Sequence, residues 1–300
     1  MEFPEHRIFE KEVESGDGLF RLTVAEEDMG GIYPAMVRYT LRLFLQTREI
    51  GVFRTNTYEY TPTNPLDAKE AALKLAAEWE SGLRGDTESF LTSLSQRRPS
   101  RQFDTLPAGV IIIQGSPRAD GNCSIMIEWA VESVLKSGEH ARVIYPHDLD
   151  ISPCIGCYRC YNTGRCIFDD DMSPIIAAVR ACRLLIICTP IYTNTVPGGL
   201  KMVIDRFQAY HAERCISERV TGQKGLLFSV AGREGTEHFR CITNVVQPFF
   251  QNIGISTCGR ILVDGADRIR DVRRIAGLKE KVESEVLQCL SGEANSSDRI

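Results

Sequence analysis

Four cysteines close together in the chain are the residues best suited to carry chemistry. They are spaced C-x2-C-x2-C-x5-C and are Cys154, Cys157, Cys160 and Cys166. Gly156 and Gly164 lie between them and allow the backbone to turn sharply. Thiolates repeated at intervals of three can surround one inorganic cube, so the spacing favours a [4Fe–4S] cluster.

Zinc and free thiols are the two alternatives for this segment. A tetrahedral zinc site usually joins two C-x2-C pairs from distant segments, which three evenly spaced cysteines suit less well. Free thiols in an exposed loop would be open to oxidation.

The chain has eleven cysteines, and most of those outside this segment lie among apolar residues. We interpret those as small buried side chains, because a reducing compartment argues against disulfides. The seven cysteines outside the motif are Cys123, Cys182, Cys188, Cys215, Cys241, Cys258 and Cys289.

A polar loop follows the buried strand expected at residues 109–113, and a helix is expected to start at its end. A helix N-terminus at the carboxyl end of a parallel strand supplies unpaired N–H groups that suit a phosphate. The candidate phosphate-binding residues are Ser116, Arg118, Asn122, Cys123 and Ser124. The loop has neither the Gly-x-Gly-x-x-Gly nor the Gly-Lys-Ser/Thr pattern, which argues against a dinucleotide fold and a P-loop NTPase. A polar turn without a ligand is the alternative.

Two more strand ends carry residues that suit a flat ring system. A Pro-x-Tyr sequence with hydroxyl and amide groups follows one strand, and a glycine-containing turn follows the next. Because the carboxyl ends of parallel strands share one edge of the sheet, all three loops are expected to form one site. The candidate ring-binding residues are Pro190, Ile191, Tyr192, Thr193, Asn194, Thr195, Ala231 and Gly232.

The elements that position these loops alternate along the chain. Strands are expected at 109–113, 141–145, 183–188, 225–230 and 260–263, with helices between them. Strands that alternate with helices predict an α/β fold with a five-stranded parallel sheet covered on both faces. We expect this domain to span residues 107–290, followed by a polar tail at 291–300.

The N-terminal third has another pattern. Residues 20–60 are rich in β-forming side chains, with a hairpin at 39–46 and 50–53, and an amphipathic helix is expected after Pro65. The segment 84–106 is polar and is interpreted as a linker. We therefore predict a small α+β domain of unknown role at residues 1–100, with a polar linker at its end.

Composition excludes several partners for this 300-residue chain. A net charge of −5 and no long basic tract argue against nucleic acid and anionic membranes as partners. The longest apolar stretches are strand-length, and the charged N-terminus is not a signal peptide. We predict a cytoplasmic protein.

The loops together resemble the NADPH-dependent FMN reductase family of flavodoxin-like proteins, over about residues 108–265. The resemblance rests on Gly115-Ser116-Pro117-Arg118, Gly121-Asn122, Thr189-Pro190-Ile191-Tyr192 and the segment from Gly199-Leu200-Lys201 to Asp205-Arg206. It implies a doubly wound sheet with the FMN phosphate on residues 116–124 and the isoalloxazine against residues 190–195. Cys123 stands where the family more often has threonine, and a thiol is a weaker donor.

The cysteine spacing inside this fold resembles the iron–sulfur flavoprotein subgroup of the family. The resemblance implies that Cys154, Cys157, Cys160 and Cys166 bind a [4Fe–4S] cluster. It also implies a homodimer or homotetramer in which the cluster of one subunit lies near the FMN of another.

The function expected from these features is electron transfer. A ferredoxin-like donor would deliver electrons through the cluster and FMN to a small molecule or protein. One alternative is an NAD(P)H-dependent FMN or quinone reductase with a structural cysteine loop, and another is a redox sensor that binds a partner through residues 1–100. No catalytic acid–base pair is expected, and the five histidines form no ligand spacing.

Overall fold

The computed structural model describes residues 3–16, 18–60, 66–95, 109–118, 120–217 and 222–291. Contacts divide the chain into two compact units. The first unit comprises Met1–Ser100, Ile155–Ile167 and Ala212–Glu218, and the second unit comprises the remaining segments. Most of the predicted tail and the second half of the predicted linker lie outside the described residues. Within the described ranges, no helix is long and apolar enough to cross a membrane.

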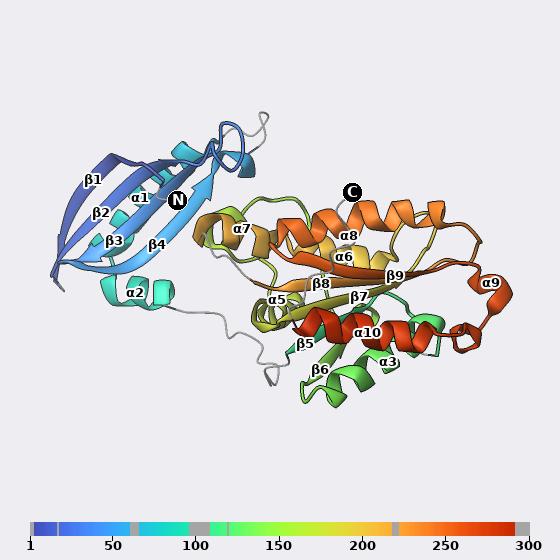
Figure 1. Ribbon diagram of the computed structural model, residues 1–300. Coiled ribbons are helices and arrows are strands. Elements are labelled where there is room, and N and C mark those ends of the chain that lie inside the picture. Colours follow the sequence, from blue (N-terminus) through green and yellow to red (C-terminus); the bar gives the residue numbers. More distant parts are fainter. Residues whose placement is uncertain are drawn as a thin grey trace. The chain divides into compact units, whose positions relative to one another are not determined.

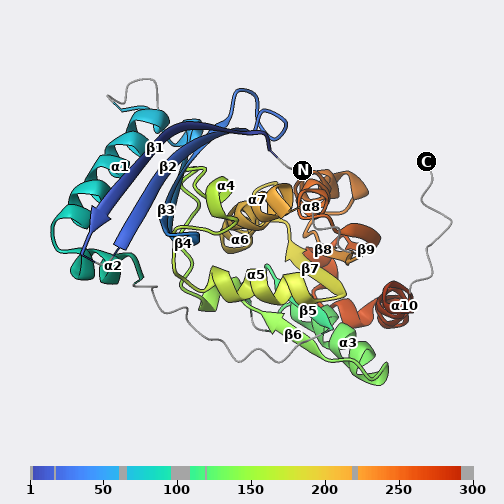
Figure 2. The same cartoon turned by 90° about the vertical axis from the view of Figure 1, so that its left-hand side faces the viewer.

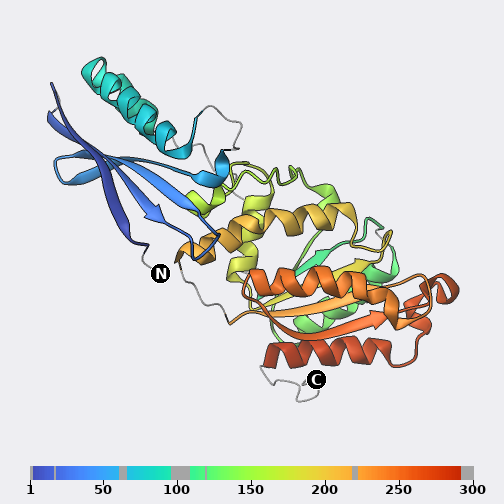
Figure 3. The ribbon, with the colours of Figure 1, turned by 90° about the horizontal axis from the view of Figure 1, so that it is seen from above.

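The first unit is built on a four-stranded antiparallel sheet in the order β1-β2-β3-β4. Its strands are β1 (Glu5–Ser15), β2 (Gly18–Asp28), β3 (Val37–Leu45) and β4 (Arg48–Asn56). Helix α1 (Ala68–Arg84) runs alongside the sheet (Figure 3) and packs its apolar stripe on one face. That stripe contacts Leu22, Leu41 and Leu43, which alternation places on the same side of their strands.

Two elements of this unit were not expected from the sequence. Strand β1 is an edge strand, and most of its side chains are charged or exposed. The apolar pattern that normally indicates a strand is therefore weak in this segment. Helix α2 (Thr87–Ser95) lies in the segment predicted to be a polar linker. Phe90, Leu91 and Leu94 pack against the core of the unit, at a spacing typical of a short helix.

The other face of this sheet is polar. Arg38 and Glu27 form a buried ion pair there, with Thr40 beside them. The segment 155–167 belongs to the same unit and contains the short helix α4 (Cys160–Thr163), which lies beside β4 (Figure 2). The cysteine-rich segment and the N-terminal sheet are therefore parts of one compact body.

The second unit is the predicted α/β domain, and its flavodoxin-like fold is confirmed. All neighbouring strands are parallel, in the order β6-β5-β7-β8-β9 (Figure 1). The strands are β5 (Val110–Gln114), β6 (Ala141–Ile144), β7 (Leu184–Pro190), β8 (Lys224–Val230) and β9 (Ser256–Val263). The three inner strands β5, β7 and β8 are buried almost throughout, as a sheet covered on both faces requires.

Helices cover both faces of this parallel sheet. Helices α3 (Asn122–Lys136) and α10 (Leu278–Ser291) pack together on one face, and α5 (Met172–Ala181) lies on the opposite side from α3 (Figure 2). The other helices are α6 (Gly198–Arg206), α7 (Gln208–Ser217), α8 (Arg240–Asn252) and α9 (Ala266–Ile269).

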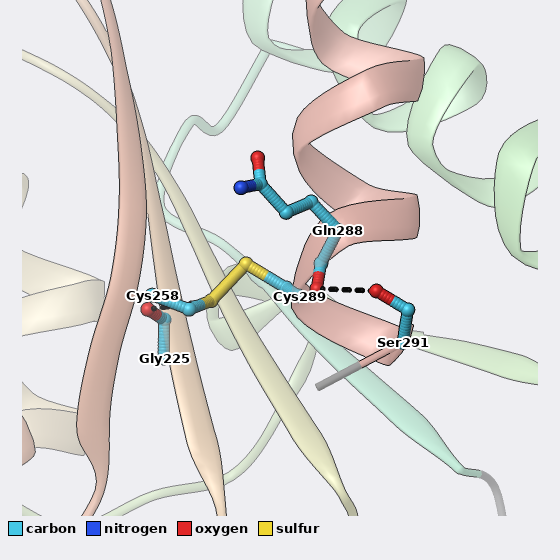
Figure 4. The surroundings of a disulfide bond; sticks show 5 residues. All are labelled: Gly225, Cys258, Gln288, Cys289 and Ser291. Carbon is cyan, nitrogen blue, oxygen red and sulfur yellow. Dashed lines mark hydrogen bonds between the residues drawn. A yellow bond between two sulfur atoms is a disulfide. The ribbon is translucent and has the colours of Figure 1, made fainter. Parts of the chain in front are cut away.

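A disulfide joins Cys258 of β9 to Cys289 of α10 (Figure 4). The interpretation of these two cysteines as separate buried thiols is therefore wrong. Their Cα atoms lie 5.7 Å apart because α10 packs beside β9, and this distance is normal for a disulfide. The separation of 31 residues gives no indication of the pairing in the sequence.

Candidate functional site

A cavity of about 920 Å³ opens at the carboxyl ends of β5, β7 and β8. This edge includes the point where the chain connections leave β5 and β7 toward opposite faces, which is where open α/β sheets bind ligands. The three predicted loops meet here. The predicted residues that line the cavity are Ser116, Arg118, Asn122, Cys123, Pro190, Ile191, Tyr192, Thr193, Asn194, Ala231 and Gly232.

Ser124 and Thr195 are the two predicted residues that do not line the cavity. The Ser124 hydroxyl donates to the Arg118 carbonyl at 3.1 Å and accepts from the Gln114 amide at 2.9 Å, so it braces the loop from inside. Thr195 pairs through its backbone with Tyr192. For both residues the structure indicates a supporting role.

The start of helix α3 is suited to an anion. No described side chain caps this helix at Gly121, so its first N–H groups point toward the cavity edge without a side-chain acceptor. Gly115 allows the loop to leave β5 closely packed, because a Cβ there would lie 2.7 Å from Leu200. The backbone N–H groups and the Arg118 guanidinium together suit a phosphate.

Gln114, the last residue of β5, organises this loop and was missed in the sequence. Its buried Nε2 donates to the carbonyls of Ser116 and Arg118, at 3.4 and 3.3 Å, and to the Ser124 hydroxyl. In the sequence, Gln114 is a single amide at the end of an apolar strand. The first exposed residue of a turn would look the same, so the sequence does not reveal its buried role.

The second loop makes a tight turn with strained residues. Thr193 and Asn194 have φ values of 46° and 57°, and backbone hydrogen bonds of 2.9 and 3.0 Å between Tyr192 and Thr195 close the turn. Two successive positive φ values are typical of a type I′ turn, which normally favours glycine or asparagine. Backbone strain of this kind clusters at ligand sites, because the surrounding structure must maintain it. The turn presents Pro190, Ile191 and Tyr192 to the cavity.

The cavity is also lined by basic side chains that sequence reasoning missed. Arg233, His238 and Arg270 line it together with Arg118, and Asp267 is the acidic residue of the lining. These residues follow β8 and β9, where charged residues in the sequence resemble solvated turns. The site thus offers an uncapped helix start and guanidinium groups for a phosphate, beside an apolar and aromatic strip for a ring. This donor set fits FMN.

A buried ion pair closes the base of the cysteine loop, which we define as residues 154–166. The Arg206 guanidinium binds both carboxylate oxygens of Asp170, at 2.6 and 2.8 Å, and donates to the Ser152 carbonyl at 2.6 Å. Ser152 precedes the loop and Asp170 follows it, so this contact holds the two ends of the loop together. Burial tends to raise the pKa of Asp170, but hydrogen bonds from Arg206 and from two backbone N–H groups outweigh it and lower the pKa.

The cysteine loop offers four thiols that are all free of disulfides. Cys160 is buried, Cys157 and Cys166 are half-buried and Cys154 is exposed. Gly156, Tyr158 and Gly164 have left-handed backbone conformations, with φ values of 64°, 56° and 71°. For tyrosine this conformation costs about 1–2 kcal/mol, so other contacts must hold it. Thiolates are the ligands that iron–sulfur clusters take, so the residue types of this loop suit a cluster. Among the described residues, no group of three or more His, Cys, Asp or Glu side chains is gathered closely enough to hold a metal ion.

Comparison with known proteins agrees with this geometry. Residues 109–255 match the model of the NADPH-dependent FMN reductase family. An iron-sulfur flavoprotein of Methanocaldococcus jannaschii is 34% identical over 97 residues, which are 32% of this chain and 50% of that protein. An iron-sulfur flavoprotein of Methanosarcina thermophila is 33% identical over 94 residues, or 31% of this chain and 49% of that protein.

A third relative matches over a longer segment. An iron-sulfur flavoprotein of Archaeoglobus fulgidus is 26% identical over 195 residues, which are 58% of this chain and 98% of that protein. The chain thus spans about half the length of the first two relatives and nearly all of the third.

Proposed function

Because residues 109–255 match the model of the NADPH-dependent FMN reductase family, we propose that the chain is an iron–sulfur flavoprotein that transfers electrons between a [4Fe–4S] cluster and FMN. The observation that carries the proposal is a loop with four cysteines outside any disulfide, in a chain that also has a cavity at the flavin position of its flavodoxin-like fold.

The chain's own residues have distinct tasks in this function. Arg118 and the first N–H groups of α3 bind the FMN phosphate, and the Pro190–Asn194 turn supports the ring. The cluster ligands are Cys154, Cys157, Cys160 and Cys166. When bound, FMN supplies hydride and single-electron chemistry and the cluster supplies single-electron chemistry, so the protein needs to supply position and electrostatics.

The electron donor separates two versions of this function. In the first version a ferredoxin-like protein delivers single electrons through the cluster. In the second version NAD(P)H reduces the flavin directly and the cysteine loop is structural. The four cysteines of the cysteine loop support the first version. The observation behind the second version is that Arg118, Arg233 and Arg270 all line the cavity, which is more positive charge than one phosphate requires. A cytoplasmic location and a homodimer or homotetramer are further parts of the proposal.

Iron and acid-labile sulfide per chain, measured in anaerobically purified protein, test the cluster. We expect about four of each, and we expect Cys157→Ser to lower both while Cys182→Ser, which alters a buried thiol of the second unit, leaves them unchanged. Zinc in place of iron, or no metal with an intact flavin, would refute the cluster. Stopped-flow reduction of the flavin by reduced ferredoxin or by NADPH then identifies the donor.

A further inference from the structure

The cysteine loop is hydrogen-bonded to the end of strand β4 through a buried asparagine. The Asn162 amide donates to the Arg54 carbonyl at 3.1 Å and to the Glu59 carboxylate at 2.6 Å, and its oxygen accepts from Asn56 at 2.8 Å. Asn162 and Asn56 are 4% and 0% exposed. A buried amide without hydrogen-bond partners would destabilise the fold. Both asparagines have their partners here, so the contact is specific.

Glu59 connects the same network to two more parts of the loop. One carboxylate oxygen accepts from Asn162 and from the backbone N–H of Asn56 at 2.8 Å. The other oxygen accepts from the Arg159 guanidinium at 2.8 Å. Asn56 also donates to the Tyr158 carbonyl at 3.2 Å, next to the strained backbone of that residue. A few polar residues at the end of β4 thus hold residues 158, 159 and 162 at once.

A cluster of aromatic rings makes a second, independent contact. Tyr33 and Tyr58 come from the N-terminal segment, and Tyr158 and Tyr161 come from the cysteine loop. The ring centroids of Tyr33 and Tyr161 lie 5.1 Å apart, and those of Tyr58 and Tyr158 lie 5.0 Å apart. Such distances are typical of favourable aromatic pairs. In addition, Arg38 donates to the Tyr161 carbonyl at 3.2 Å.

The residues that make these contacts lie next to Cys160 in the chain. Cys160 opens α4, and its carbonyl accepts from the Gly164 N–H at 2.7 Å, which closes a single helical turn around Asn162. One turn of helix is unstable by itself, so its shape depends on tertiary contacts. The contacts at Tyr158, Tyr161 and Asn162 flank Cys160 on both sides in the sequence.

We propose that the N-terminal sheet is a platform that fixes the shape of the cysteine loop, with Asn162 and Glu59 as positioning residues for Cys160. The part of this inference that concerns a cluster rests on the proposed function, whereas the part that concerns the thiol does not. It gives a role to an N-terminal segment that lies outside the family match at residues 109–255.

The first test measures the thiol and needs no cluster. Full-length protein, freed of metal by a chelator, is treated with iodoacetamide, and the labelled cysteines are located by peptide mass spectrometry. Cys160 is buried, so it should react slowly in the wild type. We expect Asn162→Ala and Glu59→Ala to accelerate its labelling about tenfold or more, because each leaves buried partners unsatisfied. Glu59→Gln keeps the acceptor for Asn162 and loses only the half-exposed pair with Arg159, so it should accelerate the labelling much less than Glu59→Ala.

The second test measures iron, sulfide and FMN per chain, with the midpoint potential of the cluster. Asn162→Ala should lower iron and sulfide or shift the potential while FMN stays near the wild-type content. Asn244→Ala, an exposed asparagine of α8, is the matched control. Unchanged labelling and unchanged iron in Asn162→Ala would overturn the platform. A wild type without iron would refute the cluster alone, since the labelling result would still decide the platform.

Discussion

Replacing Arg206 by methionine should destabilise the second unit strongly. The substitution removes the hydrogen bonds from the guanidinium to both oxygens of Asp170 and to the Ser152 carbonyl, and leaves the Asp170 carboxylate buried. Removing one partner of a buried ion pair typically costs about 3–5 kcal/mol. We therefore expect the free energy of unfolding to fall by about that amount.

Urea unfolding followed by tryptophan fluorescence measures this loss. The chain has two tryptophans. Trp79 is in α1 of the first unit and Trp129 is in α3 of the second, so a Trp79→Phe background makes the signal report the second unit. Arg183→Met is the matched control, because Arg183 is 62% exposed and its pair with Glu139 should contribute only about 0–1 kcal/mol.

The pH dependence has a definite sign. In the wild type the pKa of Asp170 is lowered, so its stabilisation is complete above the unfolded value of about 4 and is lost as the pH falls through the folded value. In Arg206→Met the hydrogen bonds and the charge of Arg206 no longer lower the pKa of Asp170, so that pKa is higher than in the wild type and the loss of stability is largest at neutral pH. The difference between the two proteins should shrink as the pH is lowered toward 4. Arg206→Met with Asp170→Leu should recover much of the stability.

The result that would refute this reasoning is equal destabilisation by Arg206→Met and Arg183→Met at pH 7. A difference that grew in acid would equally contradict it.

Three further predictions concern the flavin site and the disulfide. Gln114→Leu removes the amide beneath the phosphate loop and should weaken FMN binding about five- to tenfold in a fluorescence titration; an unchanged dissociation constant would contradict its role. Arg118→Ala should weaken FMN about tenfold or more but leave riboflavin, which lacks the phosphate, nearly unaffected; equal loss for both would place Arg118 elsewhere than at the phosphate. Cys258→Ser should lower the free energy of unfolding by about 3–4 kcal/mol, as expected for a closed segment of 31 residues. Dithiothreitol should then have no further effect on that variant, and a wild type equally stable with and without dithiothreitol would refute the estimate.

The sequence predicts the second unit well because its signals are local. A strand buried on both faces is a continuous apolar run, such as residues 110–113, and the helices between such runs are amphipathic. The common edge of a parallel sheet then brings the loops at Ser116, Pro190 and Ala231 together without further information.

What the sequence does not predict depends on contacts between distant residues. Asn56 and Asn162 are 106 residues apart, and each is an ordinary polar residue until the fold buries both. Arg233 and Arg270 look like solvated turn residues, yet they line the cavity because β8 and β9 end at the same edge as β5. His238, which is part of no ligand spacing in the sequence, also lines it.

Because β9 and α10 are joined by a disulfide, the redox conditions used to purify this protein affect its cysteines in opposite ways. Its sulfur atoms are oxidised, whereas the four sulfur atoms of the cysteine loop are thiols. A buffer with a thiol reductant protects the loop but opens an accessible disulfide by exchange, and air preserves the disulfide but oxidises exposed thiols. Anaerobic buffer without a thiol reductant preserves both states. Preparations made in any other way should differ from it in stability or in metal content, even though the amino-acid sequence is the same.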